Sequence, residues 1–268
     1  MLPVKCVSLG LVAALAAAVP AFADDDPTHN LTVGLGIGFT ADYEGSDDLQ
    51  VIPIAPITYE NRFVTIRSIG LGLEADLVPS KAIDIGPMFR YRFSRDDVDD
   101  VRIDALPDVD ASLELGGFVR TGVPLELLGI DDPTIIFAQL SAMHDVIDGH
   151  GGALVEGRTG VIRPLTESLT GIVSVSTTYA SEDFMNSFFD VTAAGSAASG
   201  LRAFDADAGL KDVGVAAILN YKINDKWSTT LLGGYSRLIG DAADSPVVTD
   251  AGSENQFMAG FSVNYKLF

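Results

Sequence analysis

The stretch "LTVGLGIGFTADYEGSDD" (31–48) decides the fold class, because its apolar residues occupy every second position from Leu31 to Ala41. Threonines and glycines lie between them, and an acidic segment follows. A period of two gives a β-strand with one apolar face and one small or polar face. The predicted strand is eleven residues long, whereas a common strand has about 5–6 residues.

Three further stretches repeat this alternation at similar length: "AIDIGPMFRYRF" (82–93), "ASLELGGFVRT" (111–121) and "VGVAAILNYKI" (213–223). Strands of roughly 9–11 residues suit a sheet tilted across a hydrocarbon layer. Their second face mixes glycines with single charges of both signs, which is typical of a crowded barrel interior. The pattern therefore predicts an all-β fold, a transmembrane antiparallel β-barrel. A soluble sandwich with the same alternation is the alternative.

Short and long connections alternate along the chain, and the longest lie at 94–109, 181–210 and 240–254. In outer-membrane barrels the short turns face the periplasm and the long loops face the outside. The phenylalanine-rich connection at 181–210 is expected either to fold into the mouth as a plug or to extend outward. We predict about twelve strands, at 31–41, 50–59, 62–68, 70–78, 81–93, 110–122, 133–144, 151–163, 168–180, 211–223, 226–239 and 255–268.

The first residues have the pattern of a secretory signal peptide. Lys5 precedes an apolar run over 7–19, and small residues at 21–23 fit a cleavage site. We therefore expect a signal peptide at 1–23 and a single barrel domain at 24–268, exported to the bacterial outer membrane. Cys6 is the only cysteine of the chain, so the exported part can form no disulfide.

The formal net charge of −20 argues against nucleic acid as a partner, because phosphate contacts need basic clusters. Of the 37 acidic residues, 21 lie in the long connections, where charges keep a surface soluble. A second hypothesis is that Asp42, Glu44, Asp47 and Asp48 share divalent cations with the anionic headgroups of outer-membrane lipid and lipopolysaccharide. The chain contains no calcium-loop motif, and we expect neither a metal site nor a cofactor.

The chain ends in "FMAGFSVNYKLF" (257–268), an alternating strand with a terminal phenylalanine, as bacterial outer-membrane barrels commonly do. Five further stretches read "ADYEGSDDLQVIPIAPITYENRF" (41–63), "IGPMFRYRFSRDDVDD" (85–100), "DVDASLELGGFVR" (108–120), "SGLRAFDADAGLKDVGVAAILNYKINDKWS" (199–228) and "GYSRLIGDAADSPVV" (234–248). Together they resemble the MipA/OmpV family of outer-membrane proteins. This resemblance implies an outer-membrane barrel without a settled molecular activity. Some members are implicated as scaffolds that bind a murein hydrolase and a murein synthase, and others are discussed as porin-like proteins or adhesins.

Charges on the second face of the strands are predicted to point into the lumen. They either neutralise one another in an occluded interior or line a narrow path for small polar solutes. Arg90 and Arg92 are expected to form a local positive site, because alternate residues of a strand share a face. The predicted lumen charges are Glu74, Asp76, Asp84, Arg90, Arg92, Glu114, Arg120, Glu156, Arg158 and Lys222.

The segment "PLELLGIDDP" (124–133) is the longest predicted periplasmic link and is unusually apolar for an exposed turn. Leu125, Leu127, Leu128 and Ile130 either contact a periplasmic partner, such as a murein hydrolase or synthase, or extend the strand ends into the lipid interface.

No catalytic arrangement is evident from the spacing of residues. His144 is the best candidate for a general base, but Ser141 is three residues away and so lies on the opposite face of the strand. We therefore predict no enzymatic activity. The leading hypothesis is an envelope scaffold for murein-remodelling enzymes, and the alternatives are a small porin-like channel or an adhesin acting through acidic surface loops.

The assignment of faces also predicts the effects of substitutions. Arginine at Leu35 or Leu219 should meet lipid and cost roughly 2–4 kcal/mol near the middle of the membrane. Serine at Gly36 or Asn220, on the opposite face, should have a milder effect.

Overall fold

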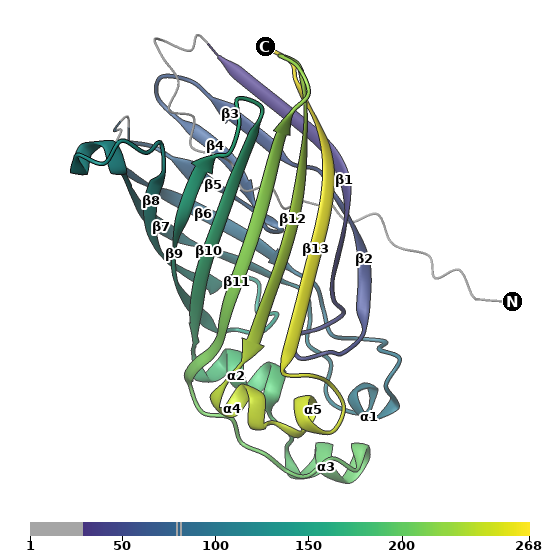
Figure 1. The fold of residues 1–268 in the computed structure, drawn as a ribbon. Coiled ribbons are helices and arrows are strands. Elements are labelled where there is room, and N and C mark those ends of the chain that lie inside the picture. The colour runs from purple at the N-terminus through teal and green to yellow at the C-terminus, as the bar shows by residue number, and fades with distance from the viewer. Residues whose placement is uncertain (1–28, 79, 81) are drawn as a thin grey trace, which may run out of the picture.

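The computed structural model describes residues 29–78, 80 and 82–268, so the expected signal peptide lies outside the described residues. This part of the chain forms one antiparallel sheet, which closes because β1 pairs with β13 (Figure 1). Its strands are β1 (Asn30–Ala41), β2 (Leu49–Ile54), β3 (Ile57–Glu60), β4 (Thr65–Ile69), β5 (Gly72–Asp76), β6 (Ile83–Arg92), β7 (Ser112–Pro124), β8 (Ile135–Asp145), β9 (Ala153–Pro164), β10 (Leu169–Ala180), β11 (Gly209–Lys222), β12 (Trp227–Leu238) and β13 (Asn255–Lys266).

Two of these strands, β2 and β3, occupy the place of one, because both pair with β1. β2 lies against residues 36–41 of β1, and β3 lies against residues 30–33. The ladder is interrupted between them at Ala55 and Pro56. The barrel is therefore twelve-stranded, which confirms the prediction of an all-β antiparallel barrel of about twelve strands.

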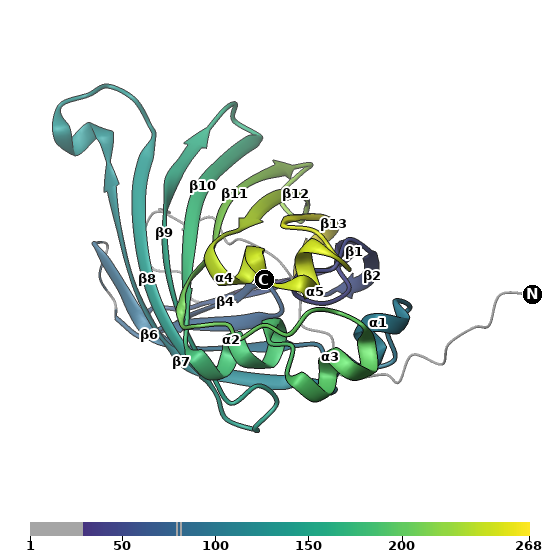
Figure 2. The ribbon, with the colours of Figure 1, turned by 90° about the horizontal axis from the view of Figure 1, so that it is seen from below.

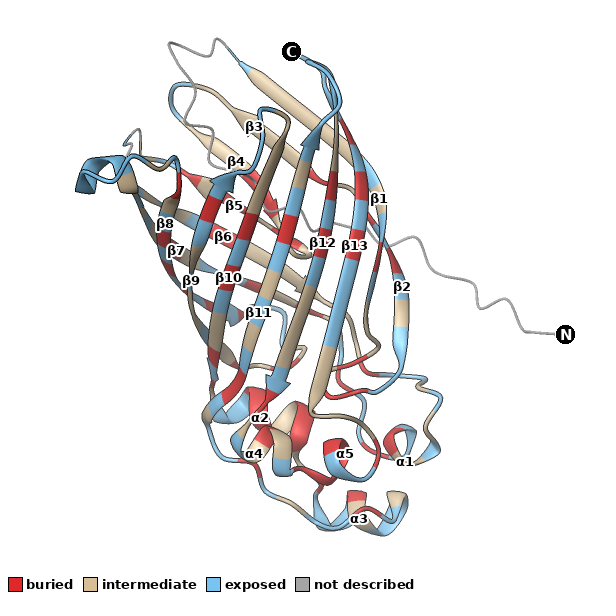
Figure 3. Cartoon of the chain, in the orientation of Figure 1, coloured by how far each residue is buried: buried red, intermediate tan, exposed pale blue. Residues whose placement is uncertain are grey.

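Apolar side chains cover the outside of the barrel on the predicted faces. Leu35 is 76% exposed, and Val215 and Leu219 are also exposed. Buried and half-buried residues alternate with them along the strands (Figure 3). Trp227 packs against Tyr265 with 4.7 Å between ring centroids, and such aromatic side chains suit a membrane–water interface. Among the described helices, none is long and apolar enough to span a membrane.

Gly36 is required by the close approach of β1 and β13. A Cβ at this position would lie 2.0 Å from the carbonyl oxygen of Phe261 and 2.7 Å from the Cα of Ser262. Both are backbone atoms, so neither can rotate away. Serine at Gly36 should therefore strain the seam between the first and last strands, and the expectation of a mild effect is corrected for this site.

The lipid-facing and lumen-facing sides can be compared at two adjacent residues of β10. Val175 is exposed on the outside, and Ser176 lines the interior. We expect Val175→Arg to lower the unfolding free energy by about 2–4 kcal/mol, because the charge meets lipid near the middle of the membrane. Ser176→Arg, in which the charge enters a polar cavity, is the control and should have a smaller effect. Urea unfolding in lipid vesicles measures both, and equal losses would contradict the assignment of faces.

The long connections fold together into a helical cap at one end of the barrel (Figure 1). Their apolar side chains form two buried clusters, one around Phe184, Phe188 and Phe189 and one around Ile103 and Val247. Seen from this end, α4 and α5 lie within the ring of strand ends (Figure 2). The cap helices are α1 (Val101–Asp104), α2 (Glu182–Phe189), α3 (Ala193–Ser199), α4 (Gly240–Asp244) and α5 (Pro246–Thr249).

The sequence of α2 explains why this loop folds inward. Acidic residues at 182 and 183 occupy its first turn, where their negative charges interact favourably with the positive end of the helix dipole. Phe184 and Phe188 are four residues apart, so they lie on the same face of the helix, and both are buried. Of the two alternatives for 181–210, the structure shows the one in which the segment packs over the mouth.

Candidate functional site

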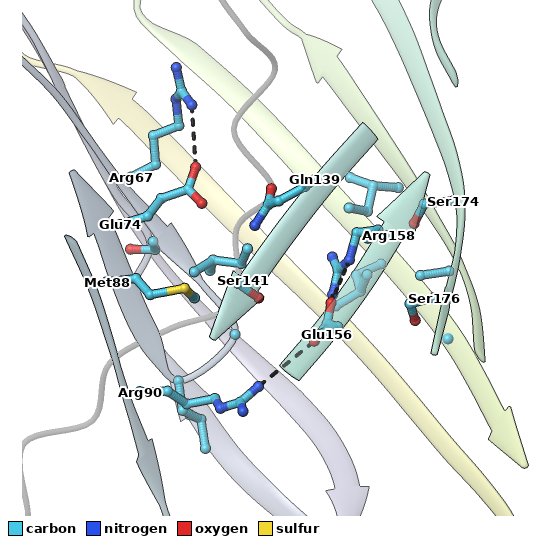
Figure 4. A pocket seen from close by; sticks show the side chains of 18 of the residues that line it. Arg67, Glu74, Met88, Arg90, Gln139, Ser141, Glu156, Arg158, Ser174 and Ser176 are labelled. Carbon is cyan, nitrogen blue, oxygen red and sulfur yellow. Dashed lines mark hydrogen bonds and ion pairs between the residues drawn. The ribbon is translucent and has the colours of Figure 1, made fainter. Parts of the chain in front are cut away.

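The barrel encloses a cavity of about 780 Å³. It extends from Glu44 and Phe188 under the cap to Phe63 and Ser80 at the short-turn end. Charged and hydroxyl side chains from several strands point into this space (Figure 4). These side chains form two groups of ion pairs.

The first group, which we call the cap-side cluster, is centred on Glu114. This residue is only 1% exposed, and its carboxylate accepts hydrogen bonds from Arg90 Nε at 2.7 Å and from Arg92 Nε at 2.9 Å. His150 Nε2 lies 3.2 Å from the same carboxylate. Arg90 and Arg92 therefore form no free positive site, because Glu114 lies between them. The cluster consists of Glu44, Arg90, Arg92, Glu114, His150, Glu156, Arg158, Lys211 and Asp212.

Glu44 connects the cap to the barrel wall. It lies in the first long connection but turns inward, where its carboxylate accepts hydrogen bonds from Arg92 at 2.8 Å and from Lys211. Burial alone would raise the pKa of Glu44, but Lys211 and Arg92 outweigh burial and lower the pKa to about 2. Because the pKa is lowered, this contact stabilises the cap above the ordinary carboxyl pKa and is lost only as the pH falls toward 2. The inward orientation removes Glu44 from the carboxylates that were expected to face lipid headgroups.

Helix α2 covers the cap-side cluster at the cap end of the lumen. The guanidinium carbon of Arg92 lies 5.0 Å from the centre of the Phe184 ring, and Lys211 Nζ lies 5.7 Å from it. A cation over an aromatic face is attracted by the ring quadrupole. The apolar cap thus rests directly on charged residues of the lumen.

The second group, which we call the mid-barrel cluster, consists of Arg67, Glu74, Asp84 and Arg120. Arg120 donates to Asp84 at 2.6 Å and to Oε1 of Glu74 at 2.7 Å. Arg67 donates to the same Glu74 oxygen at 3.2 Å (Figure 4). The other oxygen, Oε2, is buried and has no hydrogen-bond partner among the described residues. The cluster contains two acids and two bases, so it stiffens the wall without giving the lumen a net charge.

Another part of the inner wall is apolar. Side chains from β8 to β12 pack together there and are nearly fully buried. The lumen therefore combines ion pairs with a hydrocarbon surface. The apolar residues are Phe137, Ile162, Ile172, Ile218 and Leu232.

Nine of the ten predicted lumen charges lie inside the barrel, as buried or half-buried residues of β5, β6, β7 and β9. Lys222 does not lie with them, because it is the last residue of β11 and pairs with the exposed Asp225 in the following turn. Asp76 lines the cavity, but one of its oxygens accepts from the backbone amides of Val78 and Ile85. Arg67 was missed, although its alternation with Ile66 is a signal that could have placed it.

The predicted periplasmic link forms the 3₁₀ turn η1 (Leu125–Leu128), which projects from the wall at the end opposite the cap (Figure 1). Leu127 is 78% exposed and Leu128 is 62% exposed. Ile130 is exposed as well, whereas Leu125 is half-buried. A left-handed Gly129 ends the turn. The four predicted contact residues are thus adjacent in space as well as in sequence.

His144, the candidate base, lies on the outer side of β8, where its Nδ1 is 3.0 Å from the carbonyl oxygen of Gly152. Ser141 is buried on the opposite face. Within residues 29–78, 80 and 82–268, no three His, Cys, Asp or Glu side chains form a group that could hold a metal ion.

Comparison with known proteins assigns the chain to a family. The family model of the MltA-interacting protein MipA matches residues 33–267. The chain belongs to the MipA family. The match runs through the barrel from β1 to β13, so this MipA-family chain is an outer-membrane β-barrel, and the family suggested by the sequence is confirmed. No curated protein matches the chain.

Several solved structures are similar to this MipA-family barrel. An outer membrane channel from Pseudomonas putida F1 has 12% sequence identity and a TM-score of 0.48, with 94% of this chain and 100% of that chain covered. The NanC porin has 9% identity and a TM-score of 0.42, with 88% and 100% covered. The KdgM porin has 8% identity and a TM-score of 0.38, with 88% and 99% covered.

Proposed function

We propose that the protein is a non-catalytic scaffold of the outer membrane, which holds a murein-remodelling enzyme in the periplasm through η1. The observation that carries this proposal is the exposure of Leu127 and Leu128 on a turn that projects from the barrel. An apolar patch that is left in water commonly marks an interaction site. The family description, MltA-interacting protein, supports a protein partner.

The composition of the turn favours a protein partner over burial in the lipid interface. Glu126 lies within η1, and Asp131 follows it, and both side chains are exposed. Placing these carboxylates in hydrocarbon would be costly. A protein surface can instead cover the leucines while it leaves the carboxylates at the wet rim of the contact.

The scaffold function requires export of the chain to the outer membrane. Residues 1–23 act as the signal peptide, and residues 24–268 form the single domain that assembles in the outer membrane. As in other outer-membrane barrels, the short turns, η1 among them, face the periplasm. The cap then faces the outside of the cell.

The scaffold function can be tested with a charge on each exposed leucine. The double variant Leu127→Glu and Leu128→Glu should release the murein enzyme, because each buried leucine contributes about 1.5–3 kcal/mol to a contact. The measurement is a pull-down of the tagged full-length barrel from cell envelopes, with bound enzymes identified by mass spectrometry. The control is Leu165→Glu, which places the same charge on another exposed short turn. An unchanged set of bound murein enzymes in the double variant would contradict the proposal.

A second candidate function is the passage of small polar solutes, which the 780 Å³ cavity and its ion pairs favour. Under this hypothesis the cap must open, because α4 and α5 lie over the mouth. Single-channel recording of the purified wild-type barrel distinguishes the two functions. A barrel that stays closed at all voltages excludes the channel and leaves the scaffold.

A further inference from the structure

The barrel wall is interrupted in the half that lies near the cap. β2 pairs with β1 on one side, and no described strand pairs with its other edge. The next hairpin along the wall, β4 with β5, is too short to reach this level: β3 and β4 share only residues 58–60 and 65–67. On the cap side of its paired residues, β6 is hydrogen-bonded to the hairpin through the amide of Tyr91, which donates to the carbonyl of Leu71. From there toward the cap, β2 and the end of β6 face each other with no strand pairing between their described residues.

The sequence of β2 is adapted to an unpaired edge. The strand reads "LQVIPI", and "AP" follows it. A proline has no amide hydrogen to donate, so within sheets it is confined to edges and bulges. Pro53 lies inside the strand, and Pro56 lies at the break before β3. A closed barrel normally has no such edge, because an unpaired backbone is costly in lipid.

The interruption lies at the level of the lipid chains. Leu49 and Val51 of β2 are exposed on the outside of the barrel. They pair with Ala41 and Phe39 in the cap-side half of β1. With the cap outside the cell, this half corresponds to the outer leaflet. Lipid chains therefore lie directly against the gap.

Among the described residues, apolar side chains pack in the gap. Ile52 and Ile54 of β2 are buried, and Leu71 and Phe93 pack against them. Tyr91 stacks edge-on against Phe93 with 5.3 Å between ring centroids. All five residues also line the lumen cavity. Unlike a ladder of backbone hydrogen bonds, such an apolar plug can be displaced by rotation of side chains.

We propose that the gap between β2 and β6 is a lateral opening, through which amphipathic molecules with a single alkyl or acyl chain move between the outer leaflet and the lumen. The apolar residues of the gap, with those of β8 to β12, accommodate the chain. The ion pairs of the cap-side and mid-barrel clusters accommodate a polar or zwitterionic head, because each cluster contains acids and bases together. The cap closes the route along the barrel axis, so the lateral route is the one that connects this cavity with the outer leaflet.

The opening can be tested by quenching of tryptophan fluorescence by brominated lipid chains. The chain has one tryptophan, so Trp227→Phe removes the native tryptophan fluorescence, and each probe is introduced into that variant. Ile52→Trp places the probe at the opening, and Ile172→Trp is the matched control. Both isoleucines are 6% exposed and line the cavity, but β10, which carries Ile172, is paired on both sides. The full barrel is reconstituted in vesicles of phosphatidylcholine with brominated acyl chains.

We expect several-fold stronger quenching for Ile52→Trp than for Ile172→Trp. Addition of decylphosphocholine, a zwitterionic amphiphile with one chain, should relieve the quenching at position 52 by displacing the brominated chains. Equal quenching at the two sites would overturn the opening. Quenching that decylphosphocholine leaves unchanged would overturn the ligand class, because only bilayer lipid would then enter the gap. Ile54→Trp with Ile218→Trp as its control repeats the comparison, in case Ile52→Trp fails to assemble.

Discussion

Glu114→Gln should lower the unfolding free energy of the barrel by about 3–5 kcal/mol, the loss that follows when one partner of a buried ion pair is removed. Glu114 is buried and accepts hydrogen bonds from Arg90 and Arg92. Glutamine keeps the shape of the side chain but not its charge, so two guanidinium groups lose their shared counter-charge. Urea unfolding in lipid vesicles, followed by the loss of heat-modifiable migration on gels, measures the change.

The control for this prediction is a pair of the same chemistry at the surface. Glu254 accepts from Arg237 at 2.6 Å, and both side chains are at least one-third exposed. Glu254→Gln should therefore change the unfolding free energy by at most about 1 kcal/mol. If the two variants unfold alike, then the cap-side cluster contributes little to stability and Glu114 is not its centre.

Phe184→Ala should release the cap and open the barrel to ions. The Phe184 ring is fully buried between Phe188 and the cations of Arg92 and Lys211. Removal of a buried phenylalanine side chain costs about 3–5 kcal/mol, which is large for a cap of short helices. Planar-bilayer recording should show a closed wild-type barrel and a conducting variant, and hydrogen exchange should show faster exchange over α2 and α4.

Phe63→Ala is the matched control for the cap variant. Phe63 also lines the cavity, but it lies at the short-turn end and is exposed. The control should therefore leave both conductance and hydrogen exchange near the wild-type values. Conductance that is equally low in the wild-type protein and in Phe184→Ala would mean that the charged clusters, and not the cap, close the lumen.

The alternation of residues predicted the strands, because a lipid-facing strand must present an apolar side chain at every second position. The length of the strands and the pattern of short and long connections then predicted the barrel. The second predicted strand, 50–59, shows where this reasoning stops. Its apolar residues run without interruption from Val51 to Ile57, across the break between β2 and β3, so the apolar pattern continues where pairing does not. Pro53 and Pro56 were the available signal, since neither can donate to a ladder.

The lumen charges were predictable from the face of the strand but not from the position along it. Glu114 and Lys222 both occupy inward positions of the alternation. Glu114 lies at the level of Arg90 and is neutralised, whereas Lys222 is the final residue of β11 and reaches water. The pairing of Glu44 with Lys211 spans 167 residues, and no local pattern could indicate it.

The order in which the molecule is built follows from the composition of the cap. Tyr43, from the first connection, donates a hydrogen bond to the carbonyl of Ala251, from the last. Ile103 and Val191 of the same apolar cluster come from two other connections, 94–109 and 181–210. This small core cannot form until the four connections that supply it lie together at the same end of the barrel. We therefore expect the cap to fold last, after the strands that carry these four connections have been assembled.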